Sequence, residues 1–265
     1  MNNTLIKGLQ VVEFLAHSDR QQSLTDIANN LGLAKSNVHR LLQALSELKY
    51  VIRDDVTGGY SASIKLWELG SAVLSKLDLK RHAEQWMSTL MDQTGETVHL
   101  SVLDEDEVVY VHKIESDNPI RAYTQIGGRI PAYCVATGKA MLAYRSDSML
   151  QRIAGNLKPI TPTTITSPKR FAQEIEKIRK QGYAVNRGEW REGVYGVAAP
   201  ILDGSGQVIA AIGLSGPAAR FRPQQIKGFA DHLGRAAEAI TLSLGGNQSY
   251  HALGYITRHM VSAKK

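Results

Sequence analysis

The sequence predicts an α+β protein in which a small helical domain precedes a larger domain of alternating strands and helices. The first domain is predicted by two short amphipathic helices within residues 24–50, separated by Gly32, and by β-rich runs at residues 50–53 and 60–62. The second is predicted by strand-like alternation after residue 97, interleaved with helical periods. The length of 265 residues suits two domains.

Three helices are predicted at the start of the chain. The first covers residues 5–16, supports the next two and is expected to bury Leu5, Leu9, Val12 and Leu15. The second carries a short apolar stripe and ends at Gly32; the stripe consists of Ile27, Ala28 and Leu31. The third is expected to bury one face through residues at helical spacing, namely Val38, Leu41, Leu42, Leu45 and Leu48.

The opposite face of the third helix is polar near its N-terminus, where it carries Ser36, Asn37, His39, Arg40 and Gln43. Backbone N–H groups and hydroxyls can bind phosphates there, and Asn, Gln and Arg can pair with base edges in a DNA major groove. An ordinary helical hairpin produces the same pattern. These residues alone therefore leave both interpretations open.

A predicted two-stranded wing favours the DNA-binding interpretation. Tyr50–Arg53 and Tyr60–Ala62 are predicted strands around the polar turn Asp54–Gly59, which ends in two glycines. A helix-turn-helix followed by such a hairpin is a winged helix. Arg53 and the turn would then lie near the backbone or minor groove of the flanking DNA.

A connector is predicted after the wing. A helix over Ile64–Leu74 leaves the first domain, and Ser75–Leu79 is the expected hinge. The next helix ends at Gly95. Its inner stripe is expected to comprise Ala83, Trp86, Met87, Leu90 and Met91.

Two strands, Thr97–Leu103 and Val108–Ile114, are expected around an acidic turn, Asp104–Glu107. In a simple hairpin Leu103 pairs with Val108, which would place His99 opposite His112. Two facing histidines could bind a metal, but no third or fourth ligand lies at a useful spacing. The pattern therefore favours a structural role for them.

The remaining elements follow the same alternation. Ser167 and Pro168 suit the N-cap and first position of a helix that Gly182 ends. The others are predicted in chain order as a strand at Ile120–Gln125, helices at Thr137–Tyr144 and Ser146–Gly155, a hairpin of Gly196–Leu202 and Gln207–Ser215, and a helix over Pro223–Leu244.

Charge alone does not locate a nucleic-acid surface. The formal net charge is +6 and the pI about 9.3, but residues 1–75 carry seven basic and seven acidic side chains. The excess therefore lies in the rest of the chain. DNA binding has to depend on where a few cations are placed, so we expect oligomers that contact several half-sites.

Several absences predict a cytoplasmic protein. The single cysteine, Cys134, cannot form an internal disulfide, and the longest nearly apolar run, Val208–Leu214, is too short to span a bilayer. No signal peptide is recognisable at the N-terminus. The small and apolar neighbours of Cys134 favour a buried structural residue over a redox sensor.

Two groups of motifs occur in one order along the chain. The N-terminal group comprises KGLQVVEFLA, SLTDIANNLGLAKSNVHRLLQALSELKYV and GGYSASIKLWELG. The C-terminal group comprises ETVHLSVLDEDEVVYVHKIES, GGRIPAYCVATGKAMLA and GYAVNRGEWREGVYGVAAPILDGSGQVIAAIGLSGP. Together they resemble the IclR family of bacterial transcriptional regulators over roughly residues 4–246. One departure is Lys49, which stands after the recognition helix where the family usually has Gly.

The resemblance implies a winged helix-turn-helix domain over residues 1–66, a linker helix and hinge over 67–80, and a GAF-like α/β effector-binding domain over 81–246. Residues 247–265 form a tail beyond the family core. It also implies a transcriptional regulator, repressor or activator, that binds double-stranded operator DNA as a homodimer or homotetramer. A small organic acid bound in the C-terminal domain would control that binding.

The candidate DNA-binding residues follow from the winged helix. Asn37, Arg40 and Gln43 are the candidates for base contacts. The candidates for positioning the DNA backbone are Lys35, Ser36, Arg53 and Tyr60. Thr25 and His39 complete the set.

The candidate effector site is carried over from family motif positions. The backbone of Ala136 and Thr137 would meet a carboxylate, Asn186 stands where relatives often have an acidic side chain, and Ser215 keeps a motif hydroxyl. Gly196 and Gly213 replace inward-pointing Cys or Ser side chains. The other candidates are Tyr133, Glu189, Trp190 and Val194.

The two glycines lead to a hypothesis about the effector. A roomier and less polar pocket would suit an aromatic acid better than glyoxylate or pyruvate. Three alternatives stay open. Gly196 and Gly213 are strand positions where another backbone passes close, Trp190 is an interface residue, and Glu189 and Glu192 form loop salt bridges.

Two other functional classes remain as alternatives. A metabolite-handling enzyme with an appended helical domain lacks a recognisable nucleophile with a base, carboxylate pair or metal set, and no cofactor motif is present. A ligand-binding adaptor would use the winged helix for protein contacts. Salt-dependent binding to promoter DNA distinguishes such an adaptor from a regulator.

Overall fold

The computed structural model describes residues 3–75, 79–122 and 124–246 and divides into two compact units, Met1–Leu77 and Asp78–Lys265. Residues 76–78 of the predicted hinge and the predicted tail 247–265 lie outside the described residues.

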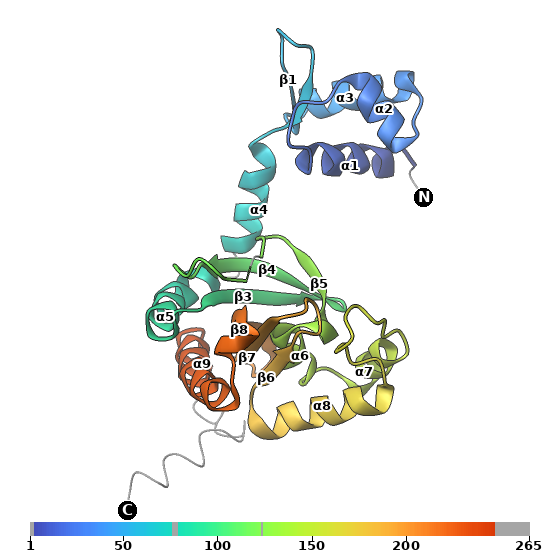
Figure 1. Ribbon diagram of the computed structural model, residues 1–265. Coiled ribbons are helices and arrows are strands. Elements are labelled where there is room, and N and C mark those ends of the chain that lie inside the picture. The colour runs from blue at the N-terminus through green and yellow to red at the C-terminus, as the bar shows by residue number, and fades with distance from the viewer. Residues whose placement is uncertain (1–2, 76–78, 123, 247–265) are drawn as a thin grey trace, which may run out of the picture. The chain divides into compact units, whose positions relative to one another are not determined.

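The first unit contains four helices and a two-stranded wing among its described residues (Figure 1). Ser23 caps α2 through a reciprocal pair of hydrogen bonds with Asp26, and Gly32 ends it with a φ of +62°. The strands of the wing pair antiparallel. The elements are α1 (Asn3–Ala16), α2 (Leu24–Leu31), α3 (Lys35–Glu47), β1 (Val51–Arg53), β2 (Tyr60–Ala62) and α4 (Lys65–Ser75).

The predicted inner face of the first helix is correct only for Leu15, which is buried. Leu5 and Leu9 are 60% and 54% exposed, and α1 buries Gly8 and Val11 in their place. The error has a physical cause: glycine adds no hydrophobic signal, so the apolar pattern did not indicate the face that carries Gly8, where an added Cβ would lie 3.8 Å from the side chain of Leu41 on α3. Val11 and Leu15 join Ile27, Val38 and Leu42, among others, in the core of this unit.

The end of α3 also differs from the prediction. Leu48 was expected on the buried face but is 58% exposed, because α3 ends at Glu47 and the chain turns away. Lys49 takes the left-handed conformation at this turn, with a φ of +62°. This confirms that a lysine occupies a backbone position that glycine adopts more easily.

The second unit contains an antiparallel sheet, with six strands among the described residues in the order β5-β4-β3-β8-β7-β6. Sequence neighbours β3 and β4 form one hairpin, and β7 and β8 form another that pairs beside it. The strands are β3 (Thr97–Asp104), β4 (Glu107–Ile114), β5 (Arg129–Pro131), β6 (Ala184–Arg187), β7 (Val194–Leu202) and β8 (Val208–Pro217).

Helices cover both faces of this sheet (Figure 1). One apolar cluster joins α5 (Leu79–Thr94) and α9 (Pro223–Ser243) to one face, through residues such as Met87 and Leu233. A second cluster joins α6 (Ala136–Leu142), α7 (Asp147–Ala154) and α8 (Pro168–Gln181) to the other, through residues such as Phe171. Trp86, expected in the inner stripe of α5, is 36% exposed.

The predicted register of the first hairpin holds only near its turn. Leu103 pairs with Val108 as expected, but a bulge between Leu100 and Ser101 shifts the rest of the ladder. His99 therefore pairs with Lys113, and His112 with Leu100. A bulge adds one residue to one strand and reverses which side chains share a face.

Two strand predictions need correction. The described residues of Ile120–Gln125 do not form a strand, and β4 pairs instead with the short β5 at Arg129–Pro131. The edge strand β6 at Ala184–Arg187 was missed. A run of four residues beside Gly182 and Gly188 gives too little alternation to distinguish a strand from a loop.

Candidate functional site

The polar face of α3 is accessible. Lys35, Ser36, His39, Arg40 and Gln43 are exposed and Asn37 is half-buried, while Val38, Leu41 and Leu42 hold the helix from behind. Among the described residues, neither Lys35 nor Arg40 is in an ion pair. Thr25 is exposed at the start of α2. This face can meet a polyanion without first breaking a contact.

Within the wing, Arg53 and Tyr60 lie together but differ in exposure. The guanidinium of Arg53 lies over the ring of Tyr60, 5.9 Å from its centroid. Arg53 is exposed, whereas Tyr60 is only 8% exposed and belongs to the core of the unit. The ring of Tyr60 is therefore used to pack the wing, and its contact with the DNA backbone stays a prediction.

The wing turn is fixed by residues that the sequence reasoning missed. Asp54 accepts hydrogen bonds from the backbone N–H groups of Val56 and Thr57, both at 2.8 Å, and from the side chain of Gln21 at 3.1 Å. The bond from Thr57 contributes most to holding the pKa of Asp54 at about 2. Thr57 also donates to Gln21 at 2.8 Å. Val56, at the tip, is 96% exposed.

The second unit contains a cavity of about 240 Å³ on one face of its sheet. Eight of the ten predicted effector-site residues line it: Ala136, Thr137, Asn186, Trp190, Val194, Gly196, Gly213 and Ser215. Residues that the prediction missed include His99, Tyr110, Gln125, Arg129 and Arg191. The cavity thus lies between the start of α6, strands of both hairpins, β5 and the loop after β6.

Two predicted effector-site residues lie elsewhere. The hydroxyl of Tyr133 donates to the carbonyl of Lys158 and accepts from its N–H, both at 3.1 Å, so the ring braces a loop outside the cavity. Glu189 is buried and its carboxylate binds Lys139 at 2.7 and 2.8 Å. The salt-bridge alternative for Glu189 is therefore the one that the geometry supports.

His99 is the most deeply buried titratable group of the cavity wall. Its Nε2 lies 2.6 Å from the hydroxyl of Ser215 and its Nδ1 3.2 Å from that of Thr124. Burial, aided by the charge of Lys113, lowers the pKa of His99 to about 4, so the ring is neutral at physiological pH. A neutral imidazole with both nitrogens engaged holds the Ser215 hydroxyl in a fixed place.

Two further polar groups complete the wall. The hydroxyl of Thr137 is buried and has no hydrogen-bond partner among the described residues. The side-chain oxygen of Asn186 accepts from the N–H of Glu189 at 2.9 Å, which leaves its NH₂ group as the remaining donor. An unpartnered buried hydroxyl costs free energy unless a ligand or water satisfies it.

The metal and redox alternatives find no support in the geometry. His99 and His112 do not face each other, and His112 lies 2.6 Å from Glu84 of α5. No group of three or more His, Cys, Asp or Glu side chains among the described residues could hold a metal ion. Cys134 is buried, and burial raises the pKa of its thiol to about 12, which suppresses the reactive thiolate.

The comparisons with known proteins cover nearly the whole chain. The family model of the IclR helix-turn-helix domain matches residues 4–55, and that of the bacterial transcriptional regulator IclR C-terminal domain matches residues 71–242. The chain belongs to the IclR family.

Individual relatives agree with this assignment. The HTH-type transcriptional regulator KdgR of Escherichia coli is 36% identical over 92% of this chain and 93% of its own length. The regulator XynR of the same species is 32% identical over 90% and 96%. The crystal structure of Thermotoga maritima IclR has a TM-score of 0.78 at 34% identity, covering 92% of this chain and all of that one.

This IclR-family chain is thus a transcriptional regulator, and the enzyme alternative is not favoured. The matched helix-turn-helix model assigns DNA binding to the first unit. Among the described helices, none has the length and hydrophobicity needed to cross a membrane.

Within the IclR pocket, the two glycines are required by packing. A Cβ atom on Gly213 would lie 2.8 Å from the Cγ2 of Thr137 and 3.0 Å from the carbonyl of Val197. One on Gly196 would lie 3.0 Å from the carbonyl of Leu214. The close-backbone alternative therefore accounts for both, and they do not enlarge the cavity as the hypothesis of a roomier pocket assumed.

Proposed function

We propose that this protein binds operator DNA in the cytoplasm as a homodimer or homotetramer and that a small organic acid in the pocket of the second unit controls this binding. DNA binding is assigned to α3 and the wing, and effector binding to the cavity lined by Thr137, Asn186 and Ser215. The observation that carries the proposal is the accessible polar face of α3 in a chain whose second unit contains a polar-walled cavity.

The DNA contacts follow from side-chain chemistry. Arg40, Asn37 and Gln43 are proposed to read bases, because forked or amide side chains near the N-terminus of a recognition helix can pair bidentately with base edges. Lys35, Ser36 and Arg53 are proposed to position the DNA backbone. With no net positive charge on residues 1–75, one protomer neutralises few phosphates, which favours an oligomer that occupies two or more half-sites.

The effector is proposed to be an organic acid, with an aromatic acid as the first candidate. Tyr110 and Trp190 supply aromatic wall, and Arg191 places a positive charge at the cavity. The hydroxyls of Thr137 and Ser215 and the amide of Asn186 can bind ligand oxygens. Because Gly196 and Gly213 are explained by close packing, the choice of an aromatic acid rests on the rings of Tyr110 and Trp190.

A mobility-shift titration tests the whole proposal. The purified protein is titrated onto DNA from upstream of its own gene at two salt concentrations, with and without a panel of aromatic and aliphatic acids. Sequence-specific binding that weakens with salt and responds to one acid would support it. Binding that ignores sequence would instead favour an adaptor whose helices contact protein.

A thermal-shift panel tests the effector class separately. Aromatic acids that bind the folded protein should raise its Tm by mass action. If only glyoxylate or pyruvate stabilises the protein, the aromatic candidate is wrong while the regulator remains.

A further inference from the structure

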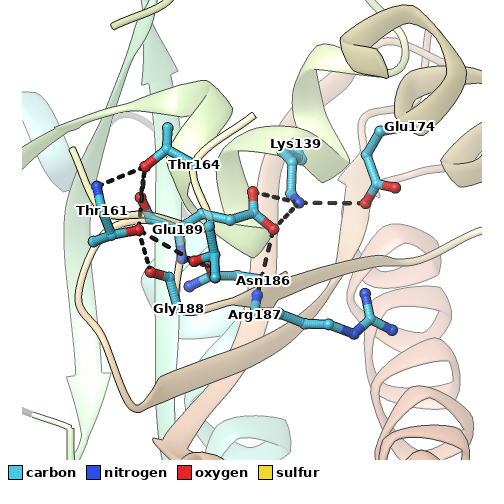
Figure 2. A network of polar contacts seen from close by, with 9 residues as sticks. Lys139, Thr161, Thr164, Glu174, Asn186, Arg187, Gly188 and Glu189 are labelled. Atoms are coloured by element: carbon cyan, nitrogen blue, oxygen red, sulfur yellow. Dashed lines mark hydrogen bonds and ion pairs between the residues drawn. The ribbon is translucent and has the colours of Figure 1, made fainter. Parts of the chain in front are cut away.

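A lysine with no exposed surface lies directly behind the effector pocket. The side chain of Lys139, on α6, is completely buried, which lysine tolerates only when its charge is paired. Its Nζ lies 2.7 and 2.8 Å from the two carboxylate oxygens of Glu189 and 3.3 Å from Glu174 on α8 (Figure 2). Lys139 is thus held by two carboxylates from two other segments.

Glu189 belongs to the loop Gly188–Gly193, which joins β6 to β7. Its two terminal glycines have φ values of +79° and +74°, which glycine adopts without strain. Backbone hydrogen bonds close the base of the loop, from Gly188 N–H to the carbonyl of Val194 at 3.1 Å and from Val194 N–H to the carbonyl of Arg191 at 3.2 Å. These bonds fix the ends of the loop, and side chains from other segments hold its first residues.

The side-chain contacts drawn in Figure 2 meet the loop at its first two residues, Gly188 and Glu189. Besides Lys139, the Glu189 carboxylate accepts from the N–H of Arg187 at 3.3 Å. Three more hydrogen bonds hold the backbone, between Glu189 N–H and Asn186 (2.9 Å), Thr164 and Glu189 carbonyl (2.7 Å), and Thr161 and Gly188 carbonyl (2.7 Å).

Both ends of the ion pair belong to segments that form the pocket. Lys139 follows Ala136 and Thr137 on α6, and Glu189 precedes Trp190 and Arg191 in the loop; these four neighbours line the cavity. The ion pair itself lies outside the lining. It therefore connects two walls of the pocket from behind without contacting a bound ligand.

A buried ion pair is a poor means of gaining stability, because desolvation of both charges offsets their attraction, whereas apolar side chains of similar size cost nothing of this kind. What distinguishes it from apolar packing is that its hydrogen bonds depend on geometry. An ammonium and a carboxylate whose hydrogen-bonding groups all have partners favour a single arrangement of the two side chains.

We propose that Lys139 and Glu189 are positioning residues whose ion pair locks the loop Gly188–Gly193 against α6 and fixes Trp190 and Arg191 at the pocket wall. The effect on effector binding rests on the proposed function. The lock itself can be measured without any effector.

The test uses Lys139→Met/Glu189→Gln, which removes both charges and keeps similar volumes. Both substitutions are made in the full-length protein carrying Trp67→Phe and Trp86→Phe, so that Trp190 is the one remaining tryptophan of three. Hydrogen exchange of the amides in residues 188–193 should become at least about tenfold faster, while exchange in β7 and β8 stays unchanged. Acrylamide should quench Trp190 more efficiently.

Two further variants provide controls. Glu174→Gln removes the outer carboxylate and leaves the Lys139–Glu189 pair, so loop exchange should match the parent. Glu189→Gln alone leaves Lys139 its second carboxylate, Glu174, and should give intermediate loop exchange; it keeps the test decisive if the double variant does not fold.

Benzoate serves as the ligand probe, followed through Trp190 emission. If the parent binds benzoate, the double variant should bind it at least about tenfold more weakly, since a disordered wall must be ordered on binding. A parent that does not bind benzoate contradicts the aromatic candidate only. Loop exchange and Trp190 quenching equal to those of the parent in both Glu189 variants would overturn the lock, whatever benzoate does.

Discussion

At the scale of single residues, the two candidate sites use opposite strategies. On α3, Arg40 and its neighbours are exposed and keep their polar atoms available for a partner. At the pocket, His99 in the wall and Glu189 behind it are buried, and their polar atoms are engaged by other protein groups. A DNA surface is read by side chains that adapt, whereas a small ligand is recognised by a wall that is already in place.

Arg40→Ala should remove sequence preference. A bidentate contact to a base is worth roughly 1–3 kcal/mol against the wrong base, so specific binding should weaken by this amount while non-specific binding changes little. Competition mobility shifts with operator and scrambled DNA measure both. Lys35→Ala is the matched control, because loss of a phosphate contact weakens both equally. If Arg40→Ala behaves like Lys35→Ala, Arg40 is a phosphate contact.

His99 should make folding stability depend on pH. The unfolded chain protonates this residue with a pKa near 6.5 and the folded protein with a pKa of about 4, so the unfolded state binds more protons between these values. Stability is therefore lost as the pH falls through this window, by roughly 1 kcal/mol between pH 7 and 5.5. Urea unfolding at both pH values should show a smaller loss for His99→Gln than for the parent.

At the scale of secondary-structure elements, helix ends that carry capping signals were predicted well, and the short strands at the edges of the sheet were not. Helices such as α8 were predicted to the residue at both termini, because Ser167, Pro168 and Gly182 give local signals that do not depend on the rest of the fold. The strand β6 and the short β5 have no such signals. Their existence depends on the neighbour that they pair with.

Lys49→Gly should stabilise the first unit. A non-glycine residue at φ +62° costs about 1–2 kcal/mol, part of which the greater entropy of an unfolded glycine offsets, so a net gain of about 0.5–1 kcal/mol is expected. Thermal unfolding of residues 1–75 followed by circular dichroism measures it. Gly32→Ala, at the same φ, is the opposite control and should lose stability; an unchanged or lower Tm for Lys49→Gly would contradict this account.

The sequence predicted the features that depend on neighbouring residues and missed those that depend on partners far away along the chain. Helical periods identified every long helix and the polar face of α3, and eight of the ten residues taken from family motifs lie in the pocket lining. The pairing of His99 was missed because the bulge at Leu100 leaves no mark in the amino-acid pattern. Likewise, nothing local to Lys139 indicates that its charge is buried, since its two partners lie 35 and 50 residues further along the chain.

At the scale of the whole molecule, the two functions lie in separate compact units. The residues proposed to contact DNA belong to the first unit, and every residue that lines the effector cavity belongs to the second. Ligand recognition therefore has no structural need for the DNA-binding domain. Control of DNA binding requires that both be joined in one chain.

The second unit should recognise the effector alone. A fragment of residues 79–246 contains all of the described sheet with its helices and all of the cavity lining, so it should fold and show the same acid-dependent rise in Tm as the full chain. Thermal-shift assays on both proteins with the same acid panel compare them directly. An acid that stabilises only the full chain would place part of its site outside the fragment.

The burial of Cys134 has a practical consequence for studying how the units communicate. Because the thiol is inaccessible and poorly ionised, thiol reagents should leave the native protein unlabelled. The native cysteine therefore does not need to be removed before a reactive cysteine is introduced for labelling. A cysteine introduced at the exposed tip residue Val56 would take up a spin label or fluorophore selectively. With a second cysteine at an exposed position of α8, the distance between the two labels could be measured with and without a bound acid.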